Sequence, residues 1–279
     1  MTTGALIFAE NNSDVDYIKL AVFAASRVKE YLGIPVSLVT TSREWLEEAY
    51  PNHGFDQVID VDNTNYGIKQ FYDGSLTSKK LKWRNLTRCQ AYDLTPYDKT
   101  LVLDSDFIVN SSTLKLAFDN DYDFQIYKNS NDLSGWRSVP TRVSDHSVPF
   151  YWATVFLFQK NYVTKAFFDL VKYIKENWNY FKTLYSIDAV MFRNDYAFSI
   201  AIHIMNGKTN GEFAVPLPGS MNYTIDRDVL VSIDGTKMKF LVEKEKHLGE
   251  YLLAKTTSLD VHVMNKMSLA RFIDGGLGV

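Results

Sequence analysis

Short apolar runs alternate along the chain with segments in which apolar residues recur every three or four positions. Leu6-Ile7-Phe8-Ala9 and Val36 to Val39 are runs of the first kind, and residues 15–32 carry the helical spacing between them. Ser13 stands where a helix N-cap is expected, with Asp16 three residues later. The order strand, helix, strand predicts a βαβ unit and therefore a parallel sheet.

The same patterns predict the remaining elements and one compact α/β domain, because no repeat, low-complexity tract or Pro/Ser linker interrupts them. Residues 63–78, rich in Asn, Gly and Asp, are expected to form a loop. Strands are expected over 57–61, 101–103, 151–158, 229–233, 239–242 and 259–263, and helices over 45–50, 79–94, 164–179, 195–205 and 267–273.

Composition narrows the class of protein. Net charge is −3 and no basic block occurs, which argues against binding nucleic acid mainly through its phosphates. Cys89 is the single cysteine, so no disulfide can form within the chain and a reducing compartment is expected. The sequence shows no signal peptide and no apolar stretch near the ~20 residues of a membrane span. We therefore expect a cytoplasmic protein.

Paired aspartates are the main candidates for chemistry. Asp-x-Asp occurs six times, so position must decide which pair matters. Asp104 and Asp106 follow the apolar strand 101–103, and ligands of open α/β sheets bind beyond the carboxyl ends of strands. Buried carboxylates need a partner, which a hard divalent cation such as Mg²⁺ or Mn²⁺ supplies. Alternatively one Asp caps a turn and the other forms a salt bridge; Asp60 and Asp62, also after a strand, are the competing pair.

A histidine near the C-terminus is the candidate third ligand. The expected strand 259–263 carries His262, and Lys266 follows four residues later. An imidazole nitrogen with two carboxylates forms a Mn²⁺-type site, and a nearby lysine can neutralise a leaving diphosphate. The alternative for a lone histidine in a strand is a hydrogen-bonded core residue.

With these residues in view, the sequence resembles the GT-A glycosyltransferases, and within them the family-8 group of glycogenin-like and galactosyltransferase-like enzymes. The segments LTPYDKTLVLDSDFIV (94–109) and DVHVMNK (260–266) carry the resemblance. It implies a GT-A, or nucleotide-diphospho-sugar transferase, fold: a Rossmann-like, mostly parallel central sheet flanked by helices, with a small C-terminal lobe. It further implies that residues up to about 120 bind the nucleotide-sugar and that about 121–279 form the acceptor half and that lobe.

The resemblance also assigns roles to residues. It implies that Asp104, Asp106 and His262 bind Mn²⁺ or Mg²⁺, and that Lys266 contacts the diphosphate of the donor, for which a UDP-sugar is favoured. The usual family-8 pattern has a Gly after the histidine and a more distant Lys. Here Met264 and Asn265 precede an earlier lysine.

Other residues are candidates for binding the donor. Arg84 and Arg88 would share one face of the expected helix 79–94 and could reach phosphate or sugar; the alternative is a solvated basic face. Glu10 and Asn11 directly follow the first strand, where this fold meets base and ribose. Ser105, between the two acids, is expected to contact the nucleotide.

Two acidic residues near the expected helix 195–205 are candidates for catalysis. Asp195 is the first choice and Asp188 the second. In an inverting transferase such a carboxylate acts as general base, and in a retaining one it stabilises positive charge on the sugar. Asp195 could equally cap the helix, and the two roles are compatible.

The sequence thus predicts a metal-dependent glycosyltransferase that moves a sugar from a nucleotide-sugar to an acceptor hydroxyl. A glycan, a protein, a lipid, a small molecule or a hydroxymethylated base in phage DNA all remain open as acceptors, the last disfavoured by the acidic charge. Nucleic acid is considered only as an acceptor, and the oligomeric state stays open. Alternatives are a haloacid-dehalogenase-type phosphatase with Asp104 as nucleophile, a non-catalytic nucleotide-sugar binder and, more weakly, a nucleotidyltransferase.

Overall fold

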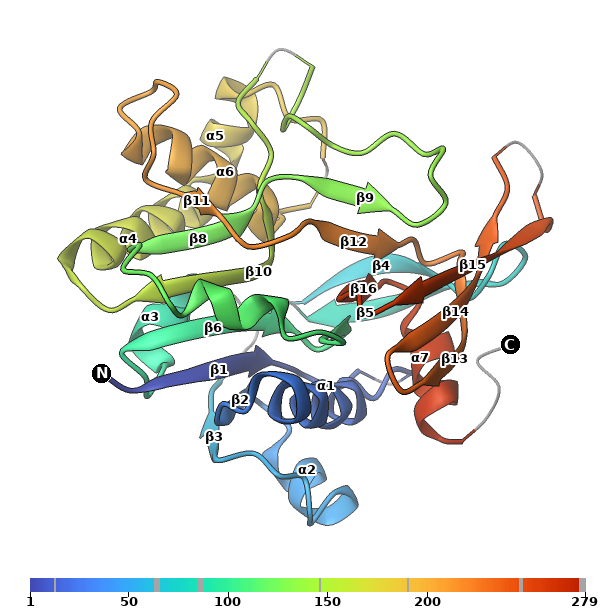
Figure 1. Cartoon of the computed structure of the whole chain (residues 1–279). Helices are drawn as coiled ribbons and strands as arrows, with labels where there is room; N and C mark the ends of the chain where they lie inside the picture. The colour runs from blue at the N-terminus through green and yellow to red at the C-terminus, as the bar shows by residue number, and fades with distance from the viewer. Residues whose placement is uncertain are drawn as a thin grey trace.

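The computed structural model describes residues 1–12, 14–62, 66–84, 88–145, 147–189, 191–245 and 248–275. Its main sheet runs in the order β11-β8-β10-β6-β1-β2-β3 (Figure 1). Strand β10 is antiparallel to both neighbours and the other pairings are parallel, so the expected α/β class with a mostly parallel sheet is confirmed. The strands are β1 (Thr3–Phe8), β2 (Val36–Thr40), β3 (Gln57–Asp60), β6 (Lys99–Asp104), β8 (Phe124–Tyr127), β10 (Trp152–Gln159) and β11 (Val215–Pro216).

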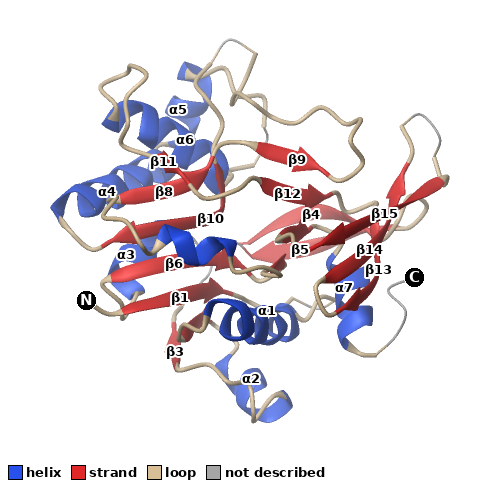
Figure 2. Cartoon of the chain, viewed as in Figure 1, coloured by secondary structure: helices blue, strands red, loops and turns tan. Residues whose placement is uncertain are grey.

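Helices flank this sheet (Figure 2). The first helix begins after Asp16, whose side chain accepts a hydrogen bond from the backbone of Lys19 at 2.9 Å, and ends at Gly33 with φ 69°. Ser13, the expected cap, lies outside the described residues. No helix in the described ranges is long and apolar enough to cross a bilayer. The helices are α1 (Tyr17–Leu32), α2 (Arg43–Ala49), α3 (Ala91–Leu94), α4 (Tyr162–Glu176), α5 (Trp178–Leu184), α6 (Asn194–Met205) and α7 (Lys266–Ile273), with 3₁₀ turns η1 (Arg88–Gln90) and η2 (Thr113–Ala117).

Smaller sheets lie toward the side of the main sheet at which its parallel strands β1 and β6 end (Figure 1). One has the order β7-β16-β12-β9 and another the order β13-β14-β15. Strands β4 and β5 form an antiparallel hairpin. Their bounds are β4 (Tyr66–Tyr72), β5 (Ser78–Arg84), β7 (Phe107–Ile108), β9 (Ser130–Asp132), β12 (Met221–Thr224), β13 (Val229–Asp234), β14 (Lys237–Glu243), β15 (Tyr251–Thr257) and β16 (Val261–Val263).

The hairpin β4–β5 corrects the sequence prediction, which expected a loop over 63–78 and a helix over 79–94. Leu81 is buried and lies between the exposed Lys80 and Lys82, an alternation with the period of a strand. Gly74, with φ 75°, supplies the turn that an L-residue would strain. Helical structure in 79–94 is limited, among described residues, to η1 and the single turn of α3, so Arg84 and Arg88 do not share a helical face.

An aromatic cluster explains much of the aromatic excess of the chain. The rings of Phe124 of β8 and Phe156 of β10 are stacked, with 5.7 Å between their centroids. The ring centroid of Phe167 of α4 lies 4.5 Å from that of Phe124. Phe198 of α6 lies 4.9 Å from Phe156. All of these rings are fully buried. The rings therefore fix α4 and α6 on the sheet and serve the core rather than a ligand.

Candidate active site

Two strand pairings bring Asp104, Asp106 and His262 together. Strand β6 is buried up to its end at Asp104, which lies beside Phe8 of β1 at the carboxyl edge of the sheet. The chain then leaves the main sheet as β7, which pairs with β16 so that Phe107 faces His262. The backbone N–H of Val263 donates to the carbonyl of Asp106 at 2.9 Å. Residues about 160 positions apart are thus fixed by backbone hydrogen bonds.

The side chains of this cluster suit a divalent cation. One ligand atom from each of Asp104, Asp106 and His262 lies within 4.8 Å of the others. His262 Nε2 is 3.2 Å from Asp106 Oδ1, and both side chains are buried. Two carboxylates and an imidazole are the donor set of a Mn²⁺-type site, and Mg²⁺ accepts the carboxylate oxygens. Within the described part of the chain this is the one such group of acidic, Cys or His residues.

Cations already neutralise both acids. Lys266 Nζ lies 2.6 Å from Asp106 Oδ2, and Arg88 of η1 forms an ion pair with Asp104. Lys266 is the first residue of α7, whose N-cap Asn265 is buried and accepts from the backbone of Ser268 at 2.9 Å. A lysine at a helix N-terminus opposes the helix dipole, so its charge is held there by Asp106 rather than by the helix.

The charges act on one another. Burial opposes ionisation of Asp106, but the positive charge of Lys266 and the interactions with His262 outweigh it and lower the pKa of this carboxyl. Burial likewise acts to lower the pKa of Lys266, and Asp106 outweighs it so that the pKa is raised. The acid therefore stays ionised and available as a ligand, and the lysine stays charged.

Of the two candidate catalytic acids, Asp195 lies near the cluster. It is in the first turn of α6, accepts from the backbone of Ala153 at 3.0 Å and pairs with Arg193 at 2.7 Å. Its charge also acts on Arg88, whose pKa burial lowers and Asp195 tends to raise. Asp188 is exposed in the turn before α6. The geometry therefore distinguishes the two carboxylates.

The other predicted donor-binding residues lie at the same edge or beyond it. Glu10 and Asn11 leave the sheet directly after Phe8, beside Asp104, and Ser105 is buried between the acids. Asn11 Oδ1 accepts from the backbone of Ile18 at 2.9 Å. The side chain of Arg84 lies outside the described part of the structure.

The competing pair is remote from the cluster. Asp60 ends β3, at the far end of the order β6-β1-β2-β3, and Asp62 is exposed. Asp60 and Asp62 therefore lie away from His262, although β3 belongs to the same sheet as β6.

Several charged residues near the cluster were missed from the sequence. Lys69 of β4 lies within electrostatic reach of Lys266, Arg193 and Asp226. Arg193 directly precedes α6, and Asp226 follows β12. No motif marks these residues; only the Asp-Gly turn at 73–74, typical of a hairpin, could have indicated that Lys69 belongs to a strand.

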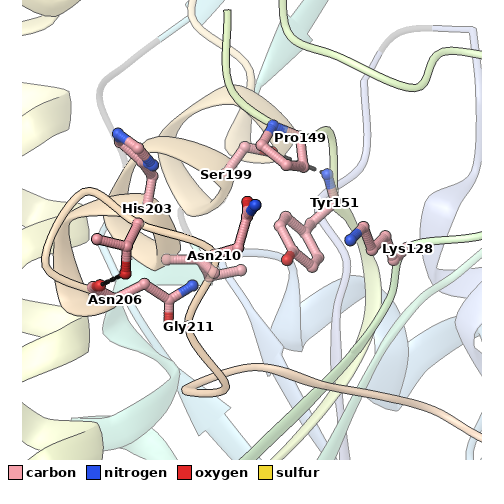
Figure 3. Close-up of a pocket in the computed structure, with 10 residues that line it drawn as sticks. Lys128, Pro149, Tyr151, Ser199, His203, Asn206, Asn210 and Gly211 are labelled. Atoms are coloured by element: carbon pink, nitrogen blue, oxygen red, sulfur yellow. Dashed lines mark hydrogen bonds between the residues drawn. The ribbon is translucent and has the colours of Figure 1, made fainter.

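A cavity of about 90 Å³ lies at the other end of α6 from Asp195 (Figure 3). Tyr151, His203 and Asn206 are among its lining residues, and His203 has a pKa lowered by burial and then by Lys208. Ligand pockets of drug-sized molecules measure roughly 300–1,000 Å³, so this cavity is too small for a nucleotide-sugar. A larger hollow of about 410 Å³ lies between the β12–β13 turn and the end of β14. Neither of these two cavities is lined by Asp104, Asp106 or His262.

Comparison with known proteins finds similarity among solved structures only. No family model matches the chain, and no curated protein matches its sequence. The glycosyltransferase GlyE of Streptococcus pneumoniae is 16% identical with TM-score 0.44, covering 78% of this chain and 45% of its own. An active-site mutant of LgtC is 15% identical with TM-score 0.46, covering 76% of this chain and 72% of its own. The bifunctional IspDF of Campylobacter jejuni is 12% identical with TM-score 0.40, covering 79% and 50%.

Glycosyltransferases are thus among the similar structures. GlyE and LgtC are both similar to this chain at low sequence identity. This chain spans less than half the length of the GlyE chain that it matches.

Proposed function

We propose that this protein is a metal-dependent glycosyltransferase that moves a sugar from a nucleoside-diphosphate-sugar, with a UDP-sugar favoured, to an acceptor hydroxyl. The observation that carries the proposal is the convergence of Asp104, Asp106 and His262 at the carboxyl edge of the sheet, within 4.8 Å of one another. The sequence resemblance over 94–109 and 260–266 supports the same reaction class.

Asp104, Asp106 and His262 would hold Mn²⁺ or Mg²⁺. Bound there, the cation would act as a Lewis acid that neutralises charge on a diphosphate. Lys266, 2.6 Å from Asp106, borders this position and would bind a diphosphate oxygen. Arg88 on the opposite acid would orient Asp104 and contribute positive charge.

The charge balance of the site favours a dianionic or trianionic ligand bound together with a cation. Asp104, Asp106 and Asp195 are matched by Arg88, Lys266 and Arg193, so the protein alone is close to neutral there. A divalent cation leaves a positive surplus that a diphosphate offsets. Binding of nucleotide should therefore depend on metal.

We assign Asp195 the catalytic role and keep Asp188 as the second choice. The carboxylate of Asp195, held by Ala153 and Arg193, would accept the proton of the acceptor hydroxyl in an inverting enzyme or stabilise the charged sugar in a retaining one. The pairing with Arg193 would hold this carboxylate in place for either role.

The remaining sequence assignments belong to the same proposal. Glu10 and Asn11 would contact base and ribose, and Ser105, Arg84 and Arg88 the phosphates or sugar. Residues up to about 120 would form the nucleotide-sugar-binding half, and about 121–279 would form the acceptor half with the C-terminal lobe that carries His262 and Lys266. The class of acceptor stays open among glycan, protein and hydroxymethylated base in phage DNA. The single cysteine supports a reducing, cytoplasmic setting.

A thermal-shift screen tests this function. UDP, GDP, CDP and ADP are each added with and without Mn²⁺, and a nucleoside diphosphate is expected to raise the Tm only when metal is present, because ligands that bind the folded state stabilise it. Asp106→Ala should abolish this shift. The control Asp121→Ala alters another Asp-x-Asp acid, which is exposed, and should keep it.

Two results would contradict the proposal. An unchanged shift in Asp106→Ala would remove the metal assignment. Hydrolysis of p-nitrophenyl phosphate without hydrolysis of any nucleotide-sugar would favour the phosphatase alternative, in which Asp104 is the nucleophile. Nucleotide-sugar binding without hydrolysis or transfer would favour a non-catalytic binder.

A further inference from the structure

The hairpin β4–β5 turns one face toward the protein, and Lys69 lies at the middle of that face. Lys69 is paired across the hairpin with Leu81, so both side chains lie on the same side. Phe71 and Leu81 on this side are buried, whereas Ile68 on the other side is 65% exposed. Lys69 Nζ lies 5.5 Å from the ring centroid of Phe71 and 5.9 Å from that of Trp83. The inner face thus presents an ammonium group among apolar side chains.

Polar contacts fix this hairpin to elements that border the metal cluster. Asp73, at the turn, accepts from both terminal nitrogens of Arg271 in α7 at 2.6 and 2.8 Å. Asp226, which follows β12, lies close enough to the backbone of Tyr72 for that backbone to act on its pKa. Helix α7 begins with Lys266 and β12 pairs with β16, the strand of His262. The hairpin is therefore anchored on both elements that carry the C-terminal half of the site.

Lys69 faces charges of both signs from these elements. Lys266 and Arg193 repel it, and Asp226 and Asp106 attract it. The pKa of Lys69 falls to about 8, first because the surrounding protein replaces part of its hydration and then because of the two cations. Lys69 is nevertheless an exposed residue, so solvent screens part of this effect. The nearby Lys266 and Arg193 destabilise the charged form of Lys69 by repulsion. A bound anion would relieve this repulsion.

We propose that Lys69 binds phosphate oxygens of the donor together with Lys266, and that the β4–β5 hairpin is therefore part of the donor site. This inference rests on the proposed function, which supplies the diphosphate. The ammonium of Lys69 offers three donors on a flexible stem. No covalent step is involved.

The test is calorimetric titration of UDP and of inorganic pyrophosphate, each with Mn²⁺, at pH 7 and fixed ionic strength. Lys69→Met is expected to weaken binding by roughly 10-fold to 100-fold, the usual loss for a charge-assisted hydrogen bond. Lys69→Arg keeps the charge and should recover most of the affinity. Lys80→Met, on the exposed outer face of the same hairpin, is the matched control and should bind as the wild type does.

Stability separates a binding role from a structural one. Because its surroundings disfavour the charged form of Lys69, Lys69→Met should not lower the Tm at pH 7 without ligand. A lower Tm together with weaker binding would mean that Lys69 merely supports the hairpin and would overturn the inference.

The outcomes also separate this inference from the proposed function. Wild-type affinity in Lys69→Met, with binding lost in Asp106→Ala, would overturn the role of Lys69 and leave the function standing. A wild-type protein that binds neither UDP nor pyrophosphate in the presence of Mn²⁺ would overturn the proposed function and this inference with it.

Discussion

Asp195 combines structural contacts with the catalytic role proposed above. Its Oδ1 accepts from the backbone of Ala153, which ties the start of α6 to β10, and its Oδ2 pairs with Arg193 at 2.7 Å. The hydrogen bond and the ion pair together hold the carboxyl group in place. A fixed position is what a group acting on a sugar or an acceptor proton requires.

Asp195→Asn separates these two contributions. The amide oxygen can still accept from Ala153, so the fold and nucleotide affinity should stay unchanged, but the basic, negatively charged oxygen is lost. We expect kcat to fall by roughly 100-fold to 10,000-fold, the usual contribution of general acid–base catalysis. Steady-state transfer kinetics with titration of UDP and Mn²⁺ measure the two effects separately. If Asp188→Asn loses turnover while Asp195→Asn retains it, the catalytic role belongs to Asp188.

Among the elements, the short strand β9 and the β12–β13 turn are joined by a buried ion network around Arg137. Arg137 pairs with Asp132 at 3.1 Å and with Asp228 at 2.6 Å, and both acids are almost fully buried. Asp228 also accepts from the backbone of Glu243 at 2.9 Å. Three parts of the fold, β9, the β12–β13 turn and the end of β14, therefore depend on one guanidinium.

Arg137→Met should be strongly destabilising. It leaves two buried carboxylates without their cation, and breaking a buried pair in this way costs about 3–5 kcal/mol. Urea denaturation followed by circular dichroism measures the change. Arg142→Met, which removes an exposed arginine bonded to the carbonyl of Ser147, is the control and should stay close to the wild type. A change below about 1 kcal/mol in Arg137→Met would mean that water already solvates these acids.

How far the sequence predicts elements depends on what each pattern encodes. Buried parallel strands such as β1, β2 and β6 are continuous apolar runs, so they were predicted correctly. The hairpin β4–β5 was missed because Lys80, Arg84 and Arg88 recur at the spacing of a basic helical face, and only the buried Leu81 and the Asp-Gly turn favour a strand. Strand β15 was missed since Leu252 and Leu253 are adjacent and both exposed, so they show no alternation.

For the whole molecule, the site depends on a contact that no local pattern encodes. Asp104 and Asp106 could be selected because they end a buried strand, and His262 through the resemblance of its segment. Their meeting depends on β7 pairing with β16, a two-residue pairing of segments about 150 residues apart. Charges from other elements, such as Lys69 and Arg193, carry no motif and could be found only in three dimensions.

This long-range construction predicts a distinct pattern of amide hydrogen exchange. Because a metal–nucleotide complex would contact segments from across the chain, adding UDP with Mn²⁺ should slow exchange together in residues 66–84, 104–109 and 260–267. Amides exchange when the structure around them opens locally, and a ligand that binds only the closed form makes such opening rarer. Helix α4, which carries Phe167 of the aromatic cluster, and helix α5, which follows it, should keep their rates and serve as the internal control. Protection of 104–109 alone would show that the ligand is held by β6 without the C-terminal strand and the hairpin, and the site would then be smaller than the one proposed here.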